Sequence, residues 1–270
     1  MHGLAVMAWF AALALGVGAP ESPYRQGAVV RGDGGWMAYF ERAGTGPALI
    51  LIPGSWDDHT AYDAFLNGVN SELHIVIVEL PGHGASMPAA VQPTMRSFGE
   101  DVFRVADELK LDTFYVGGHS IGGMIAIEMA GQTPERLLGV ISIEGWTHHS
   151  VVKDAFDGAL ANTLTPEQER QRVANRERTQ AQVTKAQIDA FGGVWRQWDG
   201  FAILSTTTVP VLEIWGDRGR DAASRAAMKI PERETITIAW IRGASHWLLL
   251  EQPLEVARAV NAFIPMKPSE

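Results

Sequence analysis

Seven short runs of apolar residues recur along the chain, and segments with helical patterning separate most of them. The runs cover residues 36–41, 48–52, 74–78, 114–116, 138–143, 209–215 and 235–241. Continuous apolar runs of this length are typical of strands that are buried on both faces of a parallel sheet. The segment 98–109, between two of the runs, has the pattern of a helix. The alternation predicts an α/β fold with a doubly wound, mostly parallel sheet.

The alternation of strand and helix stops between residues 147 and 208. This stretch is polar, and its part 165–190 has a helical composition. A polar helical segment between two sheet-forming parts is typical of an insertion over the sheet edge. We therefore predict a core of residues 28–146 and 209–266, with residues 147–208 forming a helical cap or lid.

The helix in the predicted lid has recognisable ends. Thr165 and Pro166 form a start signal, because threonine caps a helix and proline is tolerated in its first turn. Gly192-Gly193 is expected to end or bend the helix. Trp195 and Trp198 follow, three residues apart, and would share one face if the chain there is helical.

The N-terminal segment is apolar from residue 4 to residue 17, and Val17-Gly18-Ala19 resembles a cleavage site. The run is too short for an ordinary membrane span, so we expect no stable membrane insertion. No Lys or Arg precedes the run, and Pro20 follows the possible cut. Residues 1–19 are predicted to be a signal peptide or an apolar extension, which implies a secreted or periplasmic protein, with a cytoplasmic protein as the alternative. Residues 20–27 are expected to be a linker.

Bulk composition narrows the functional classes. The chain has 270 residues, 46% of them hydrophobic and 20% charged, with a net charge of −9. These values are typical of a globular protein with ample core, and the negative charge argues against a nucleic-acid partner. The chain has no cysteine, which excludes disulfides and thiol chemistry.

One short segment carries most of the chemical information. Gly118-His119-Ser120-Ile121-Gly122 matches the pattern G-x-S-x-G, between an apolar run and the helical segment 124–130. In this pattern a serine lies on a strained turn from strand to helix, and small residues two positions away avoid a clash as the turn tightens. Ser120 is therefore the candidate nucleophile.

Three further motifs accompany this turn in the correct order, and together they resemble the α/β-hydrolase superfamily over residues 36–265. The segment 51–56 resembles its oxyanion loop, although Pro53-Gly54 replaces the usual His-Gly. The segment 80–86 resembles the Pro-Gly-His-Gly-x-Ser turn, and 243–247 resembles the loop that carries the catalytic histidine. The resemblance implies a serine esterase or lactonase, with His246 as the base that takes the proton of Ser120.

The sequence leaves several candidates for the acid that would complete a catalytic triad with Ser120 and His246. The resemblance implies an aspartate after the seventh strand, but Gly219 occupies the usual position. Asp217 lies two residues earlier and Asp221 two residues later. A carboxylate must reach the histidine to fix its tautomer, so a slip of two residues matters.

Glu144 is the favoured alternative. It follows the apolar run 138–143, at a spacing from Ser120 that resembles the relocated acid of some dehalogenases and lactonases of the superfamily. A carboxylate at the end of a buried strand also needs a partner, which a histidine would supply.

The resemblance also implies an oxyanion hole built from the backbone N–H groups of Ser55 and Ile121, with the N–H of Trp56 as a second candidate if the loop register differs. Such donors stabilise the negative charge of the transition state. Four side chains are expected to line the substrate pocket: Trp56, His119, Trp146 and Trp247. We expect His119 to point away from the nucleophile.

These observations favour a serine hydrolase that cleaves a small to medium, apolar carboxylic ester or lactone through an acyl-enzyme intermediate. The alternatives are a carbon–carbon bond hydrolase or a haloperoxidase-like member of the fold, and a non-catalytic ligand-binding member. No cofactor and no metal site are predicted, because adjacent histidines such as His148-His149 rarely face one ion.

Overall fold

The computed structural model describes residues 23–151, 164–217, 225–226 and 228–266. Eight strands form one sheet in the order β1-β2-β4-β3-β5-β6-β7-β8. β1 pairs antiparallel with β2, and β2 pairs antiparallel with β4. The other neighbouring strands, from β4 through β3, β5, β6 and β7 to β8, pair in parallel. The predicted α/β fold with a mostly parallel sheet is thereby confirmed.

The strands coincide closely with the apolar runs of the sequence. They are β1 (Arg25–Val30), β2 (Trp36–Arg42), β3 (Ala48–Ile52), β4 (His74–Val78), β5 (Phe114–His119), β6 (Leu137–Ile143), β7 (Val211–Gly216) and β8 (Ile236–Ile241). All residues of β3, β5 and β7 are buried, as expected for strands covered on both faces. The expectation of a linker over residues 20–27 was wrong from Arg25 onward. β1 is an edge strand with mostly exposed residues, so it lacks the apolar signal of a buried strand.

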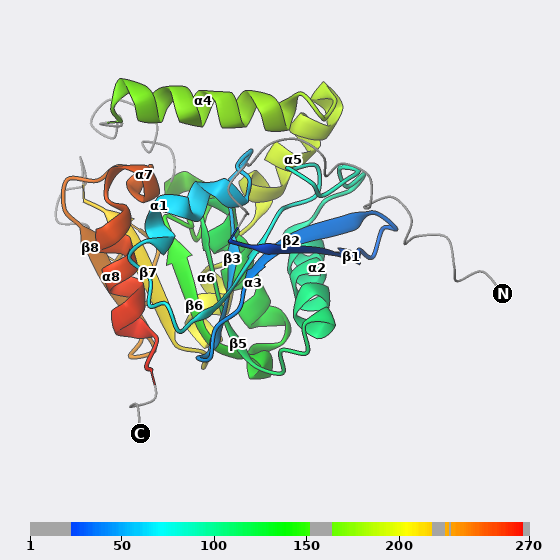
Figure 1. The fold of residues 1–270 in the computed structure, drawn as a ribbon. Helices are drawn as coiled ribbons and strands as arrows, with labels where there is room; N and C mark the ends of the chain where they lie inside the picture. Colours follow the sequence, from blue (N-terminus) through cyan, green and yellow to red (C-terminus); the bar gives the residue numbers. More distant parts are fainter. Residues whose placement is uncertain (1–22, 152–163, 218–224, 227, 267–270) are drawn as a thin grey trace.

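Helices cover both faces of the sheet (Figure 1). The described α-helices are α1 (Asp63–Leu66), α2 (Met95–Glu108), α3 (Ile121–Gln132), α4 (Pro166–Gln180), α5 (Lys185–Gln197), α6 (Phe201–Thr206), α7 (Leu248–Glu251) and α8 (Pro253–Phe263). Two apolar cores result, one between the sheet and α2 and α3, the other between the sheet and α1, α7 and α8. None of the helices in the described part of the chain is long and apolar enough to cross a bilayer.

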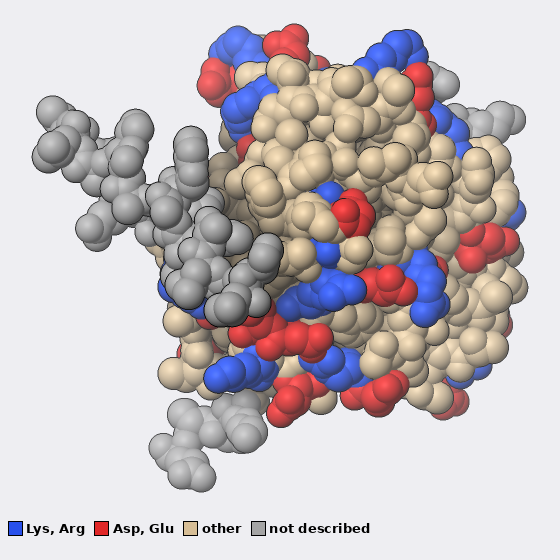
Figure 2. Space-filling model, turned by 90° about the vertical axis from the view of Figure 1, so that its right-hand side faces the viewer, with Lys and Arg blue, Asp and Glu red and all other residues tan. Residues whose placement is uncertain are grey.

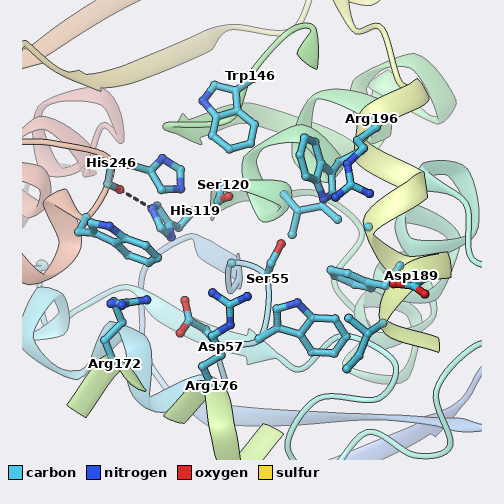
Figure 3. A pocket seen from close by; sticks show the side chains of 18 residues that line it. Ser55, Asp57, His119, Ser120, Trp146, Arg172, Arg176, Asp189, Arg196 and His246 are labelled. Atoms are coloured by element: carbon cyan, nitrogen blue, oxygen red, sulfur yellow. Dashed lines mark hydrogen bonds between the residues drawn. The ribbon is translucent and has the colours of Figure 1, made fainter. Parts of the chain in front are cut away.

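The segment predicted as a lid holds α4 and α5, and α4 crosses above the end of the sheet at which Ser120 lies (Figures 1 and 3). Thr165 caps α4 through Gln168 N, and Pro166 is its first residue, as predicted. The single helix predicted over 165–190 was wrong, because the chain turns after Gln180 and a second cap at Thr184 starts α5.

The expected helix end at Gly192-Gly193 was also wrong. α5 continues through both glycines to Gln197, and its two tryptophans then diverge. Trp195 lines the cavity next to Ser120, whereas Trp198 donates from Nε1 to Glu128 Oε2 on α3 at 2.8 Å. Packing against the core overrides the low helix propensity of glycine here.

The N-terminal residues predicted as a signal peptide lie outside the described residues. On the face shown in Figure 2, Lys and Arg side chains lie among Asp and Glu side chains, and no broad patch of one sign is present on it.

Candidate active site

Ser120 lies at the tip of a sharp turn between β5 and α3. Its backbone has φ 55° and ψ −123°, in a region that side-chain-bearing residues rarely adopt. Ser120 N donates to Ile143 O of the neighbouring strand β6 at 2.8 Å, which fixes the turn to the sheet. The side chain faces a cavity of about 670 Å³, at the N-terminus of a helix whose dipole favours negative charge (Figure 3). The turn has the geometry of a nucleophile elbow.

Two glycines allow this turn to approach the sheet. A Cβ atom at Gly118 would lie 2.3 Å from Gly122 C, and one at Gly122 would lie 2.0 Å from Ile52 O. Both contacts are with backbone, which has no room to move away. The small residues on either side of Ser120 are therefore required by the close approach of the chain to itself.

His246 comes to the site from the loop after β8. Its Nδ1 atom lies 3.3 Å from Glu144 Oε2, although the two residues are 102 positions apart in the sequence. Both residues are almost completely buried. Glu144 Oε1 in turn accepts from Gly216 N of β7 at 2.8 Å, so the backbone of β7 orients the carboxylate. With Nδ1 facing Glu144 as a donor, Nε2 is the ring nitrogen left to take a proton.

Glu144 adopts a left-handed backbone conformation, with φ 51°, directly after β6. Such a conformation is costly for a residue with a Cβ atom, and it persists only where the surrounding contacts demand it. The bond of Glu144 N to Ile214 O, at 2.9 Å, ties this turn to β7. The turn directs the carboxylate toward the histidine loop.

The two aspartates that competed with Glu144 have other positions. Asp217 Oδ1 accepts from Gly243 N at 2.5 Å, at the start of the histidine loop, and has no hydrogen bond to His246 in the part of the chain that the structure describes. Asp221 lies outside the described residues. Of the carboxylates considered from the sequence, the structure brings Glu144 to the histidine.

The loop after β3 offers backbone donors to the cavity. Ser55 lines the cavity together with Ile121, the residue after the serine. Trp56 N donates to His83 Nε2 at 2.9 Å, and the Trp56 ring stacks on the His83 ring at 4.8 Å. Burial lowers the pKa of His83 to about 4, so its ring is neutral and can accept this bond. The N–H of Trp56 is thus occupied, which leaves Ser55 N–H as the candidate donor from this loop.

His119 precedes the serine and lines the same cavity, so our expectation that it points away from the nucleophile was wrong (Figure 3). Its Nε2 atom donates to His246 O at 2.8 Å, and burial together with the nearby His246 lowers the pKa of its ring to about 3. His119 is therefore neutral and holds the backbone of the histidine loop.

Aromatic side chains form much of the cavity wall. The Trp146 ring stacks on His246 with ring centroids 5.0 Å apart, and Trp195 lies 5.8 Å from Trp146. The predicted pocket residues Trp56, His119, Trp146 and Trp247 all line the cavity. Sequence reasoning left Trp195 as one tryptophan among several, because its place depends on where α5 begins.

The opposite part of the wall carries charge that the sequence did not point out. Arg172 and Arg176 reach the cavity from α4, and Arg196 reaches it from α5 (Figure 3). Asp57 lies beside them on the loop after β3. Burial, with Asp58 as the next cause, raises the pKa of Asp57 to about 7, whereas Arg172 and Arg176 oppose the rise. A smaller cavity of about 390 Å³ adjoins beneath α4 and shares Asp57, His119, Arg172 and Trp247 with the first.

A second buried acid lies behind Glu144. Glu213 of β7 is completely buried, and its Oε2 accepts from Trp215 Nε1 at 3.1 Å. Burial raises the pKa of Glu213 to about 8, and the neighbouring Glu144 adds to the rise. In the sequence this residue is a single polar position inside an apolar run, which is the signal that could have drawn attention to it.

One group of side chains among the described residues has the spacing of metal ligands: Asp58, His59 and Glu79. Each is already engaged. Arg178 Nη2 lies 2.5 Å from Asp58 Oδ2, and His59 Nδ1 lies 2.7 Å from Glu79 Oε1. These contacts connect α4 and the loop after β3 to the core.

The fold and the strained serine turn at the end of a central strand define a class of α/β proteins. The family model of the alpha/beta hydrolases matches residues 49–259, and the chain belongs to the alpha/beta hydrolase family.

The sequence identity to individual relatives is low. The chain is 32% identical over 106 residues to a pimeloyl-[acyl-carrier protein] methyl ester esterase of Nitrosomonas europaea, a match that covers 39% of this chain and 40% of the relative. In three other curated relatives the match covers 43%, 29% and 66% of their length, so the chain spans less than two thirds of each.

Two solved structures are similar in fold. A bacterial membrane phospholipase A has a TM-score of 0.71 at 22% identity, covering 89% of this chain and 86% of that chain. Est816, described as an N-acyl homoserine lactone degrading enzyme, has a TM-score of 0.69 at 21% identity, covering 87% of this chain and 99% of that chain. At these identities the similarity shows the shared fold alone.

Proposed function

We propose that this protein is a serine hydrolase that cleaves a carboxylic ester or lactone through an acyl-enzyme intermediate. The observation that carries the proposal is that Ser120 and His246, from two separate loops, line one cavity, and that Glu144, from a third loop, contacts His246 Nδ1. The similarity to an ester-cleaving relative and to a lactone-degrading fold neighbour supports the substrate class.

In the proposed reaction Ser120 Oγ attacks the carbonyl carbon of the substrate while His246 Nε2 takes the hydroxyl proton. The carbonyl oxygen becomes an oxyanion, and the N–H groups of Ser55 and Ile121 stabilise it. The tetrahedral intermediate then collapses, the alkoxide leaves with the proton from His246, and the acyl group stays on Ser120. A water molecule, deprotonated by His246, releases the acid and restores the serine.

Glu144 has the role of the acid in this proposal. Its Oε2 atom faces His246 Nδ1 and stabilises the imidazolium that forms when Nε2 takes the proton. The aromatic wall of Trp146 and Trp195 suits an apolar acyl or alcohol group of small to medium size.

Hydrolysis of p-nitrophenyl esters of graded chain length tests the activity, and intact-protein mass spectrometry tests the mechanism. We expect turnover by the wild type, labelling of Ser120 by a fluorophosphonate, and loss of both in Ser120→Ala. Ser150→Ala is a matched control, because Ser150 is an exposed serine outside the cavity. Ester turnover that survives in Ser120→Ala would contradict the proposal.

A further inference from the structure

The arginines at the cavity are not needed for ester hydrolysis by the residues described above. Arg172 and Arg176 lie four residues apart on α4, on the face that meets the cavity containing Ser120. Figure 3 shows the guanidinium group of Arg176 beside Asp57, at the floor of the cavity in that view. In the proposed reaction the backbone N–H groups of Ser55 and Ile121 already stabilise the oxyanion. The arginines therefore add positive charge at a separate part of the cavity.

Two of the three arginines have partners that account for their positions. Arg172 pairs with Glu169 at 2.5 Å and lies over the Trp247 ring at 4.7 Å. Arg196 lies over the Trp195 ring at 4.7 Å. Arg176 has no salt bridge and no aromatic ring beneath it among the residues that the structure describes.

The acidic residues at the cavity do not cancel this charge. Asp189 pairs with Lys185 at 2.6 Å. Asp57 is the acid closest to Arg176 in the cavity, and since burial raises its pKa to about 7, a large fraction of it is neutral near pH 7. The chain as a whole carries a net charge of −9. The net negative charge of the protein repels anions, whereas the excess positive charge in the cavity attracts them. The charge within the cavity therefore decides whether an anionic ligand binds there.

We propose that the substrate carries a carboxylate in addition to its ester or lactone group, and that Arg176, with Arg172 beside it, binds this carboxylate. This inference rests on the proposed function and names its substrate class. A guanidinium group offers parallel N–H donors that match a carboxylate. Arg176, the one of the three arginines with neither a salt bridge nor a ring contact among the described residues, matches a single negative charge, which favours a carboxylate over a doubly charged phosphate. The aromatic wall holds the uncharged part of the same molecule.

Monoethyl esters of succinic, adipic and suberic acid provide the test. Each is compared with the monoamide of the same monoester, which has nearly the same shape and no charge. For the wild type we expect kcat/KM to be about tenfold or more higher for the charged ester at one of the chain lengths, because charge-assisted hydrogen bonds contribute to binding. In Arg176→Gln this ratio should fall toward one.

Arg170→Gln is the matched control. It removes the same charge from the same helix, and Arg170 is exposed, pairs with Glu167 and does not line the cavity. We expect its ratio to equal that of the wild type. A wild-type ratio at or below one at every chain length, or an equal fall in the two variants, would overturn the inference.

Failure of the proposed function is distinguishable from failure of this inference. If the wild type hydrolyses neither the charged nor the neutral esters, calorimetry measures the binding of monoethyl adipate to the Ser120→Ala variant, with and without each arginine substitution. Binding that Arg176→Gln abolishes and Arg170→Gln retains supports the carboxylate site without catalysis. Absence of binding, or tighter binding of inorganic phosphate at the same residues, overturns it.

Discussion

Two helices border the candidate active site, and they differ in how deeply they are buried and in the kind of contact that holds them. α3, which starts directly after Ser120, buries nine residues from Ile121 to Ala130 in the core. α4 buries only Asn175 and Thr179, and polar contacts connect it to the loops beneath it. Gln168 Nε2 donates to Leu250 O at 2.7 Å, and Arg178 pairs with Asp58.

In the two proposals, the reaction belongs to the side of the sheet and the recognition of the substrate to the side of α4. Ser120 and Glu144 directly follow the buried strands β5 and β6, and His246 is buried on the loop after β8, so apolar packing fixes their positions. Arg172 and Arg176 lie on the polar helix α4, whose contacts with the core are individually weak. Changes on the two sides of the cavity should therefore have different consequences.

The largest effect is expected on the side of the sheet. Glu144→Gln should lower kcat by about 10²–10⁴-fold, because the amide no longer stabilises the imidazolium or selects its tautomer. Asp217→Asn, which alters an acid that contacts Gly243, should lower kcat by less than about tenfold. Steady-state kinetics with a p-nitrophenyl ester measure both. A larger loss of kcat in Asp217→Asn than in Glu144→Gln would instead identify Asp217, after β7, as the acid of the triad.

The next effect concerns the stability of the sheet. Glu213 has a pKa of about 8 in the folded protein and about 4.5 when unfolded, so the folded state holds an extra proton between these values. Its contribution to stability is present below about pH 4.5 and is lost as the pH rises to about 8. Its charged neighbours are Glu144 and Arg225.

Glu213→Gln should remove the loss of stability that the ionisation of Glu213 causes as the pH rises. We expect the variant to gain stability over the wild type between pH 5 and pH 8, on the order of 2–4 kcal/mol. Urea denaturation at a series of pH values measures the difference. A difference between variant and wild type that is constant across these pH values would show that Glu213 does not titrate in this range.

A smaller effect is expected on the side of α4. Below about pH 7 Asp57 is mostly neutral, and above it the carboxylate partly cancels the charge of Arg172 and Arg176, with Asp58 as the other acid nearby. The preference for charged over neutral esters should therefore fall several-fold between pH 6 and pH 8.5. Asp57→Asn should keep the preference nearly constant. A wild-type preference that rises with pH would contradict this.

The smallest effect is expected for the contact between α4 and the core. Arg178 is mostly exposed and Asp58 is buried, with Thr60 as a further partner. Arg178→Gln should lower the free energy of unfolding by less than about 1 kcal/mol. It should nevertheless increase cleavage within α4 by a protease under native conditions. Equal cleavage of variant and wild type would show that other contacts hold the helix.

Much of the sheet and of the serine turn follows from local sequence. The runs at 48–52 and 74–78 match β3 and β4, because strands buried on both faces admit only apolar residues. The turn at Ser120 was recognisable because its glycines are neighbours of the serine in the chain. β1 and the break between α4 and α5 were missed, since exposed edge strands and polar helices carry little apolar pattern.

By itself, the sequence determined the family and indicated Ser120 and His246 as the candidate nucleophile and base, since these depend on short motifs whose residues are close together. Only the tertiary structure decided which carboxylate faces His246, because Glu144 and Asp217 are both adjacent to strand ends and differ only in where the turn directs them. The positions of Arg172 and Arg176 at the cavity likewise depend on how α4 lies across the sheet. Contacts between distant segments arise from packing, which no local pattern records.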